Sequence, residues 1–196
     1  MPRPVSVAIT GGIGAGKTEA LRAFARHGAA VVSSDEIVHR LLVDDGEIKA
    51  AIRERLGGDV FDEDGEVVRS SVAKRVFPDE DAREWLEALL HPKVVREYLS
   101  WRDEQARKAE PPAVTVTEVP LLYEVGGESR FERVVVITAP VEVRASRHPL
   151  ADARGTRLLP DEEKARRADF VFVNDGTLDE LDRFVASVMK ELSRSS

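Results

Sequence analysis

Short apolar runs alternate with helix-period segments along most of the chain. A first run at 5–9 precedes a helical pattern at 17–27, and a second run at 30–32 precedes another at 37–43. Three later runs are rich in β-branched and aromatic residues and cover 114–117, 133–137 and 169–173. Strands alternating with helices are typical of a parallel sheet covered on both faces, so the pattern predicts an α/β fold with a five-stranded parallel sheet.

About 70 residues between the second and third predicted strands carry no strong strand signal. Apolar residues there repeat at helical spacing, first from Ile48 to Leu56 and again from Leu86 to Val95, which predicts a helical insertion. Within it, the run 59–81 holds eight acidic residues against three basic ones. We interpret this run as a solvated face with turns, and a cation site is the alternative.

A final helix is expected from about Leu178. Thr177 and Glu180 have the spacing of a capping box at its start. The apolar residues after them form one stripe, which predicts that this helix closes the core. The stripe consists of Leu181, Phe184, Val185, Val188 and Leu192.

Composition narrows the class of protein. The chain has 196 residues, a formal net charge of −7 and no cysteine. The length fits one domain, or one core with insertions. The acidic balance argues against a general nucleic-acid or membrane-surface binder, because both need an excess of Lys and Arg. The lack of cysteine excludes disulfides, thiol catalysis and thiolate zinc sites.

Targeting signals are also missing from the sequence. The first ten residues lack the basic start and apolar run of a signal peptide, and no stretch approaches about 18 apolar residues. We therefore expect a soluble, cytoplasmic protein.

The segment directly after the first predicted strand carries the strongest chemical signal. Residues 11–18 have the sequence GGIGAGKT, which fits the pattern GxxxxGK[ST] between a strand and a helix. Glycines there let successive backbone N–H groups turn inward around a phosphate. Lys17 is expected to reach the β and γ phosphates, and the Thr18 hydroxyl to ligate Mg²⁺. We predict nucleotide binding by Gly12, Gly14, Ala15, Gly16, Lys17, Thr18 and Glu19.

The remaining sequence separates classes of P-loop protein. A GTPase needs an Asn-Lys-x-Asp motif, but Asn174 is the only asparagine and Asp175 follows it. The chain also lacks the length and partner motifs of a motor or transporter ATPase. A small-molecule kinase remains, and so does a nucleotide-binding regulatory module with an inactive site.

Six further segments accompany the phosphate loop in a fixed order. They are SSD at 33–35, GEVVR at 65–69, LEALLHP at 86–92, PLLYE at 120–124, LPDEEK at 159–164 and ADFVFVN at 168–174. Together they resemble the dephospho-CoA kinase family, whose members transfer the ATP γ-phosphoryl group to the ribose 3′-hydroxyl of dephospho-CoA. The His-Pro and Pro-Leu-Leu-Tyr-Glu segments make this resemblance more specific than the loop alone does.

The resemblance implies a three-layer P-loop kinase fold in a single domain, 1–196. Its core would cover about 1–43, 112–140 and 168–196. A helical substrate-binding insertion would cover about 44–111, and a short lid about 141–167.

The resemblance further implies that Asp35 is the general base that accepts the 3′-hydroxyl proton. Independently, a carboxylate leaving the second strand is where an in-line acceptor would need one. The alternative is that Asp35 only favours the helix dipole, because Ser33 and Glu36 have capping-box spacing. Many relatives carry a second acid where Ser33 stands.

Other roles also follow from the resemblance. Glu118, at the end of the third strand, would hold Mg²⁺ with Thr18, and a solvent-facing carboxylate is the alternative. The acceptor would be bound by Asp35, Arg69, His91, Leu121, Leu122 and Tyr123. Core packing explains the apolar members of this set equally well. His91 can instead anchor a bend, since Pro92 is expected to bend or end its helix.

Arginines follow the fourth strand, where a kinase needs forked donors for the charge on the transferring phosphoryl group. Arg147 and Arg154 fit the family's lid arginines, and pairing with neighbouring acids is the alternative. Leu158 stands where many relatives have glutamine. Asn174 is similar to a family residue near the ATP adenine, although Asn174-Asp-Gly is also an ordinary turn sequence.

We therefore expect an ATP-dependent, Mg²⁺-requiring enzyme that phosphorylates dephospho-CoA in the last step of CoA biosynthesis. Another small-molecule or nucleoside monophosphate kinase is the alternative. The expected partners are ATP and dephospho-CoA, with no nucleic acid and no membrane, and the expected state is a monomer.

Overall fold

The computed structural model of the chain describes residues 3–147 and 159–194. The chain forms two compact units, one made of residues 1–33 and 101–196 and the other of residues 34–100. Arg154 and Leu158, singled out in the sequence, lie outside the described residues. The division into core, insertion and lid stays a prediction.

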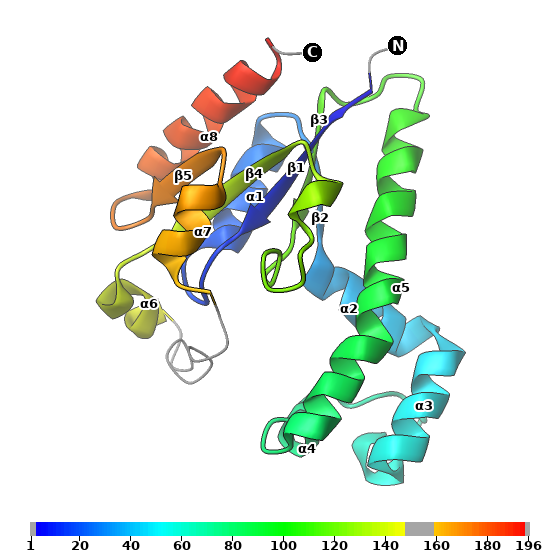
Figure 1. The fold of residues 1–196 in the computed structure, drawn as a ribbon. Helices are drawn as coiled ribbons and strands as arrows, with labels where there is room; N and C mark the ends of the chain where they lie inside the picture. Colours follow the sequence, from blue (N-terminus) through cyan, green and yellow to red (C-terminus); the bar gives the residue numbers. More distant parts are fainter. Residues whose placement is uncertain (1–2, 148–158, 195–196) are drawn as a thin grey trace. The chain divides into compact units, whose positions relative to one another are not determined.

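The first unit is built on five strands, which confirms the predicted sheet (Figure 1). They are β1 (Val5–Thr10), β2 (Ala30–Ser33), β3 (Val114–Glu118), β4 (Arg133–Thr138) and β5 (Phe170–Val173). Their order is β2-β3-β1-β4-β5 and every neighbouring pair is parallel. The chain moves from β1 to one side for β2 and β3 and to the other for β4 and β5. The segment after β1 therefore lies at the switch point of the sheet, where α/β proteins bind ligands.

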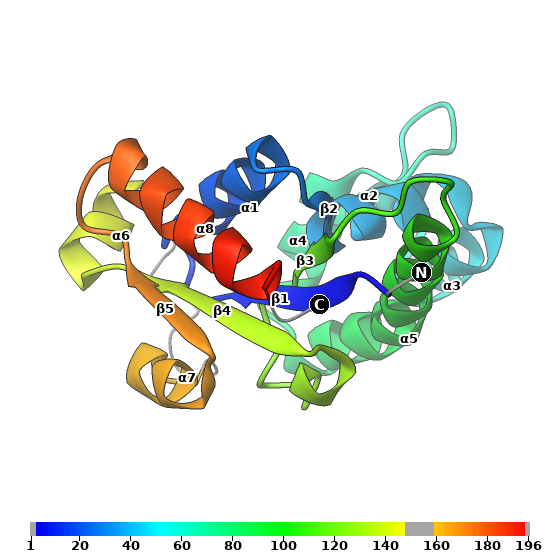
Figure 2. The ribbon, with the colours of Figure 1, turned by 90° about the horizontal axis from the view of Figure 1, so that it is seen from above.

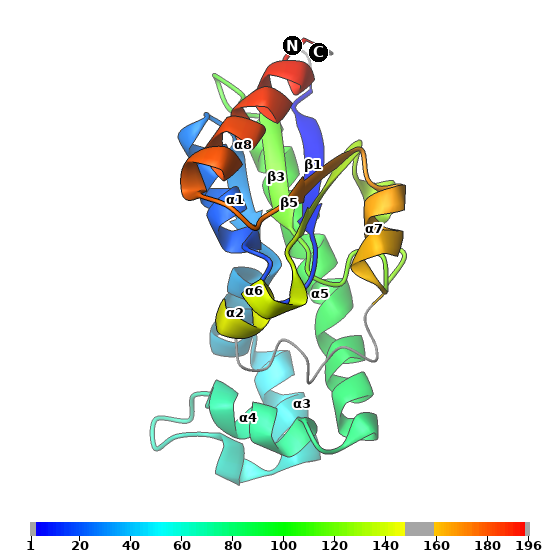
Figure 3. The same cartoon turned by 90° about the vertical axis from the view of Figure 1, so that its left-hand side faces the viewer.

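Helices cover both faces of this sheet. α1 (Lys17–Arg26) and α8 (Leu178–Leu192) lie on one face, above the sheet in Figure 2 and to its left in Figure 3. Their apolar sides share a core with the strands, in which Ile9, Phe24 and Val185 are fully buried. α7 (Asp161–Arg167) lies on the opposite face, below the sheet in Figure 2. The first unit thus has the predicted three layers.

Two shorter helical elements complete the first unit. A 3₁₀ turn, η2 (Glu128–Arg130), precedes β4, and α6 (Val141–Arg147) follows β4. No helix in the described part of the chain is both long enough and apolar enough to cross a bilayer.

The capping box of α8 forms as the sequence predicts. The Thr177 hydroxyl accepts from the backbone N–H of Glu180 at 3.3 Å, and the Glu180 carboxylate accepts from the Thr177 N–H at 2.7 Å. The bond from the Thr177 N–H is the largest cause of a lowered pKa at the Glu180 carboxyl, and a bond from the Thr177 hydroxyl to the same carboxylate, at 3.0 Å, lowers it further. The two residues satisfy N–H groups at the helix start that have no partner inside the helix.

The second unit is helical, as expected. It contains α2 (Ser34–Asp44), α3 (Gly46–Leu56), the 3₁₀ turn η1 (Gly58–Val60), α4 (Arg69–Val76) and most of α5 (Glu80–Ala106). All of residues 34–100 are described, and the only β pairing among them is an isolated bridge between Phe61 and Val67.

α5 continues through Pro92 rather than ending there. Pro92 has no N–H to donate to the carbonyl of Ala88, one turn earlier. Both residues are exposed, so water can bind that carbonyl and the helix tolerates the proline.

The acidic run 59–81 makes ordinary surface interactions. Asp59 pairs with Arg75, and the Lys49 ammonium lies 2.7 Å from the Glu66 carboxylate. The Asp62 carboxylate accepts from the backbone N–H of Glu66 at 2.8 Å and so closes a turn. Nowhere in residues 3–147 and 159–194 do three or more His, Asp or Glu form a group that could hold a metal. These contacts favour the solvated face over a cation site.

Candidate active site

The phosphate loop joins β1 to α1 and depends on glycine for its backbone. Gly11, Gly14 and Gly16 have φ of 144°, 75° and 98°, in a region that residues with a side chain rarely adopt. Space is short as well, because a Cβ on Gly11 would come within 1.9 Å of the carbonyl oxygen of Ile137. Both the backbone angles and the neighbouring strand therefore require glycine in this loop.

The predicted phosphate ligands gather at this loop. The Gly12 carbonyl accepts from the Lys17 ammonium at 3.0 Å and from the Ala15 N–H at 3.3 Å. Thr18 is exposed in the first turn of α1, and Glu19 in the same turn pairs with Arg22. The lysine, the hydroxyl and the helix N-terminus thus lie together, an arrangement that binds phosphate groups.

Asn174 contacts the far end of the same loop, and Arg147 contacts Asn174. Asn174 follows β5 and is 5% exposed, and its side-chain amide donates to the Ala15 carbonyl at 2.8 Å. Its own N–H donates to Thr138 at 2.7 Å, and its carbonyl accepts from the Arg147 guanidinium at 3.3 Å. The structure therefore brings two residues predicted from separate segments onto the loop.

Two further residues border the loop, and neither was predicted to belong to the site. The Arg144 guanidinium lies 3.6 Å from the Asp161 carboxylate, which accepts from the Thr138 hydroxyl at 2.8 Å. A Cβ on Gly12 would come within 2.6 Å of the Arg144 guanidinium. Arg144 is one of the arginines that follow the fourth strand, and no local pattern in the sequence links it to Asp161.

Glu118 is buried at the carboxyl end of β3. It is 5% exposed and pairs in register with Ile9 of β1 and Ser33 of β2. This burial does not fit the solvent-facing alternative. A carboxylate and the Thr18 hydroxyl are hard oxygen donors, and nucleotide phosphates with water supply the remaining ligands that Mg²⁺ prefers. The donor set therefore fits a magnesium site of the P-loop kind, which needs no cluster of carboxylates.

Leu121, Leu122 and Tyr123, which were predicted to bind the acceptor, differ in exposure. Leu122 is fully buried and Tyr123 is 5% exposed, and both pack in the core beneath α7. Burial raises the pKa of the Tyr123 hydroxyl, and the Arg167 guanidinium lies 4.4 Å from the ring centre. Leu121 is 37% exposed and is the member of this group that is open to a ligand.

The second unit carries the remaining predicted acceptor residues on three helices. Asp35 lies exposed in the first turn of α2, and Arg69 lies exposed at the start of α4. His91 is half-buried in α5. Their roles in binding stay predictions.

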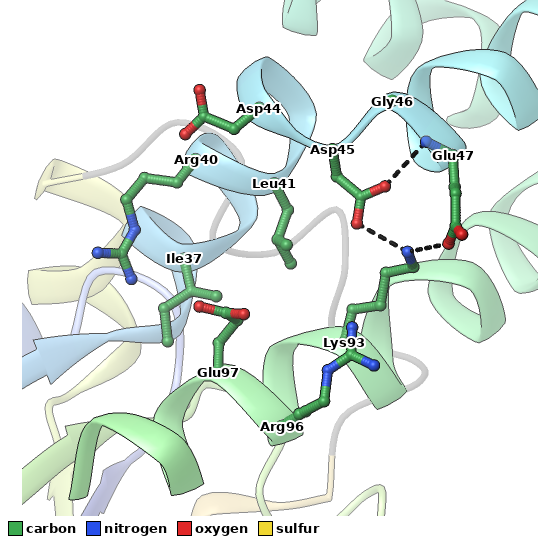
Figure 4. A pocket seen from close by; sticks show the side chains of 10 residues that line it. All are labelled: Ile37, Arg40, Leu41, Asp44, Asp45, Gly46, Glu47, Lys93, Arg96 and Glu97. Carbon is green, nitrogen blue, oxygen red and sulfur yellow. Dashed lines mark hydrogen bonds and ion pairs between the residues drawn. The ribbon is translucent and has the colours of Figure 1, made fainter. Parts of the chain in front are cut away.

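A pocket of about 930 Å³ lies within the second unit and was not predicted (Figure 4). α2, the start of α3 and α5 line it. The Lys93 ammonium donates to Asp45 at 2.7 Å and to Glu47 at 2.8 Å. These contacts raise the pKa of Lys93, and the bond from Lys93 is the largest cause of a lowered pKa at Asp45. Arg40 and Arg96 also line the pocket, and neither forms an ion pair with a described residue.

A family profile and curated relatives identify the family of this chain. A profile of dephospho-CoA kinase matches residues 5–180. Dephospho-CoA kinase of Brucella melitensis biotype 1 is 36% identical over 197 residues, which cover 96% of each chain. A crystal structure of a Thermus thermophilus protein is similar with a TM-score of 0.75 and 32% identity, over 97% of this chain and 99% of that one. Dephospho-CoA kinase from Campylobacter jejuni shares the fold, with a TM-score of 0.69, 22% identity and coverage of 96% and 97%. The chain belongs to the dephospho-CoA kinase family.

Proposed function

We propose that this chain transfers the γ-phosphoryl group of ATP to the ribose 3′-hydroxyl of dephospho-CoA, giving coenzyme A and ADP. The observation that carries the proposal is the phosphate loop with Lys17, in a chain whose family is that of dephospho-CoA kinase. In the reaction, the 3′-oxygen attacks the γ-phosphorus. The bond from that phosphorus to the β,γ-bridging oxygen breaks, and ADP leaves.

The loop provides positioning and charge rather than covalent chemistry. Backbone N–H groups and the Lys17 ammonium would hold the β and γ phosphates. Thr18 and Glu118 would hold Mg²⁺, which supplies further charge neutralisation when bound. Arg147 would reach the transferring group, and Arg154 is assigned the same role by family resemblance alone. The proposed acceptor and donor are dephospho-CoA and ATP.

Asp35 is the proposed general base. It stands two residues after β2 ends, and Ser33 at that end pairs with Glu118 on β3. A carboxylate at this place in the chain can accept the 3′-hydroxyl proton as the oxygen attacks. Ser33 is not an acid, so a scheme with paired carboxylates at 33 and 35 is not part of the proposal.

An acceptor panel tests the function directly. Purified protein with ATP and Mg²⁺ is incubated with dephospho-CoA, AMP, CMP or shikimate, and ADP formation is followed. We expect turnover with dephospho-CoA, and its loss in Lys17→Ala and Asp35→Ala proteins that remain folded by circular dichroism. If another acceptor were phosphorylated and dephospho-CoA were not, the result would favour the alternative, a different small-molecule or nucleoside monophosphate kinase. Normal turnover in either variant would remove the role given to that residue.

A further inference from the structure

The side chain of Asn174 holds the peptide bond between Ala15 and Gly16, the last one before the lysine of the phosphate loop. Its amide donates to the Ala15 carbonyl at 2.8 Å, and the residue is 5% exposed. The backbone of Asn174 is fixed in turn, because its N–H donates to Thr138 of β4 at 2.7 Å. The contact therefore ties the loop to the edge of the sheet across 159 positions of sequence.

This contact fixes the direction of a loop N–H group. No peptide bond among the described residues is cis. In a trans peptide the C=O and the N–H point in opposite directions. Since the Ala15 carbonyl points toward Asn174, the N–H of Gly16 points away from it. A phosphate-binding nest needs its N–H groups held in one direction, and this bond holds one of them.

The glycine at position 16 is explained by the same side chain. Gly16 has a φ of 98°, and a Cβ there would lie 2.2 Å from the Asn174 amide nitrogen. Among the described residues other than the chain neighbours of Gly16, the next nearest heavy atoms lie 3.5 Å and 3.9 Å from that Cβ and belong to Asn174 itself and to Arg147. Asn174 thus occupies the space that a side chain at position 16 would need.

From these contacts we infer that Asn174 is a positioning residue for phosphate binding, acting through the loop rather than through the adenine. Its side-chain amide orients the peptide between Ala15 and Gly16, so that the Gly16 N–H is presented to the nucleotide phosphates. Its carbonyl also accepts from Arg147, the arginine proposed to reach the transferring group. The inference rests on the proposed function only in assuming that the loop binds a nucleotide.

Two ligands distinguish a role of Asn174 in the loop from a contact between Asn174 and the adenine. ADP with Mg²⁺ contains adenine and phosphates, whereas inorganic tripolyphosphate contains phosphates alone. Their affinities are measured by calorimetry for the wild-type chain, Asn174→Ala and Asn174→Asp. The aspartate variant keeps the size of the side chain but has no N–H to donate. Asp175→Ala, which removes an exposed side chain of the same turn, is the matched control.

We expect both ligands to bind about tenfold more weakly to Asn174→Ala, because a buried carbonyl loses its donor and the loop loses its orientation. Asn174→Asp should weaken both ligands at least as much, and Asp175→Ala should change neither by more than about twofold. In steady-state assays of Asn174→Ala, the KM for ATP should rise while the KM for dephospho-CoA stays unchanged.

Three results would overturn the inference. A loss confined to ADP would mean that the side chain contacts the base. Unchanged affinities in both variants would mean that the loop needs no such support. Equal rises in the KM of both substrates would indicate a general loss of structure. The binding measurements need no acceptor, so a wild-type chain inactive on dephospho-CoA would reject the proposed function without deciding this question.

Discussion

The ion pair between Lys164 and Glu124 beneath α7 provides a quantitative test of how the first unit is stabilised. The Lys164 side chain is fully buried, the Glu124 side chain is 13% exposed, and the charged atoms lie 2.7 Å apart. The two groups are close but poorly aligned for a hydrogen bond, so their attraction is mainly ionic. The Glu124 carboxylate also accepts from the backbone N–H of Leu159 at 3.1 Å.

The change Glu124→Gln keeps an acceptor for Leu159 but leaves the Lys164 charge buried without its partner. At 2.7 Å and an effective dielectric constant of about 20, the gross attraction is about 6 kcal/mol. Relaxation and entering water reduce this, and breaking a buried pair from one side typically costs about 3–5 kcal/mol. We expect the free energy of unfolding to fall by that amount.

The measurement is urea unfolding at pH 7, followed by circular dichroism and tryptophan fluorescence, with coincident transitions required. Glu128→Gln is the matched control. Glu128 pairs with Arg167, which lies on α7 as Lys164 does, but both side chains of this pair are about one third exposed. That change should cost less than about 1 kcal/mol. Adding Lys164→Met to Glu124→Gln should restore most of the lost stability, since no buried charge then remains.

Two results would refute this reasoning. One is a Glu124→Gln protein no less stable than the Glu128→Gln control. The other is a double variant as unstable as Glu124→Gln alone, which would show that packing rather than the unpaired charge sets the loss.

Three further predictions follow from the second unit and α8. If the pocket in the second unit binds the anionic acceptor, Arg96→Ala should raise the KM for dephospho-CoA at least about fivefold and leave the KM for ATP unchanged. Equal KM values for dephospho-CoA in the variant and the wild type would exclude acceptor binding by Arg96. Because the pKa of Asp45 is lowered below 3.8, its contribution to stability is present above the unfolded pKa and lost as pH falls through the folded one. Asp45→Asn keeps an acceptor for the cap on α3, and it should therefore make the free energy of unfolding depend less steeply on pH between pH 2 and 6. A pH dependence as steep as that of the wild type would contradict the stabilising role given to the Asp45 charge. Thr177→Ala should lower the free energy of unfolding by about 1 kcal/mol in urea titrations, and Thr177→Ser should largely retain it.

The sequence was informative wherever a local pattern carries the physical requirement. Short apolar runs predicted all five strands, because a parallel strand that is buried on both faces appears in the sequence as a short, nearly continuous apolar run. The loop was predictable because its backbone angles demand glycine at Gly11, Gly14 and Gly16. The capping box of α8 was predictable because both partners lie within four positions of each other.

The contacts that support the loop left no such pattern. Asn174 reaches Ala15 from the other end of the chain, and Arg144 meets Asp161 only because β4, α6 and α7 converge. The pocket in the second unit likewise combines residues near 40 with residues near 96. Even the apolar segment after β3 required the structure, since only burial separates Leu121 from Leu122 and Tyr123.

The position of β1 at the centre of the sheet has a consequence for synthesis of the chain. β1 is made first, yet its neighbours are β3, where Val5 pairs with Val114, and β4, where Val7 pairs with Arg133. The ladder with β3 can therefore form only after Glu118 has left the ribosome, and the ladder with β4 only after Thr138, and such distant pairings form slowly. Until then Val7 and Ile9, fully buried in the finished protein, stay open to water and to other chains. The helical second unit, residues 34–100, is synthesised before either ladder can form. It is therefore the part of the protein able to fold while the sheet around the phosphate loop is still incomplete.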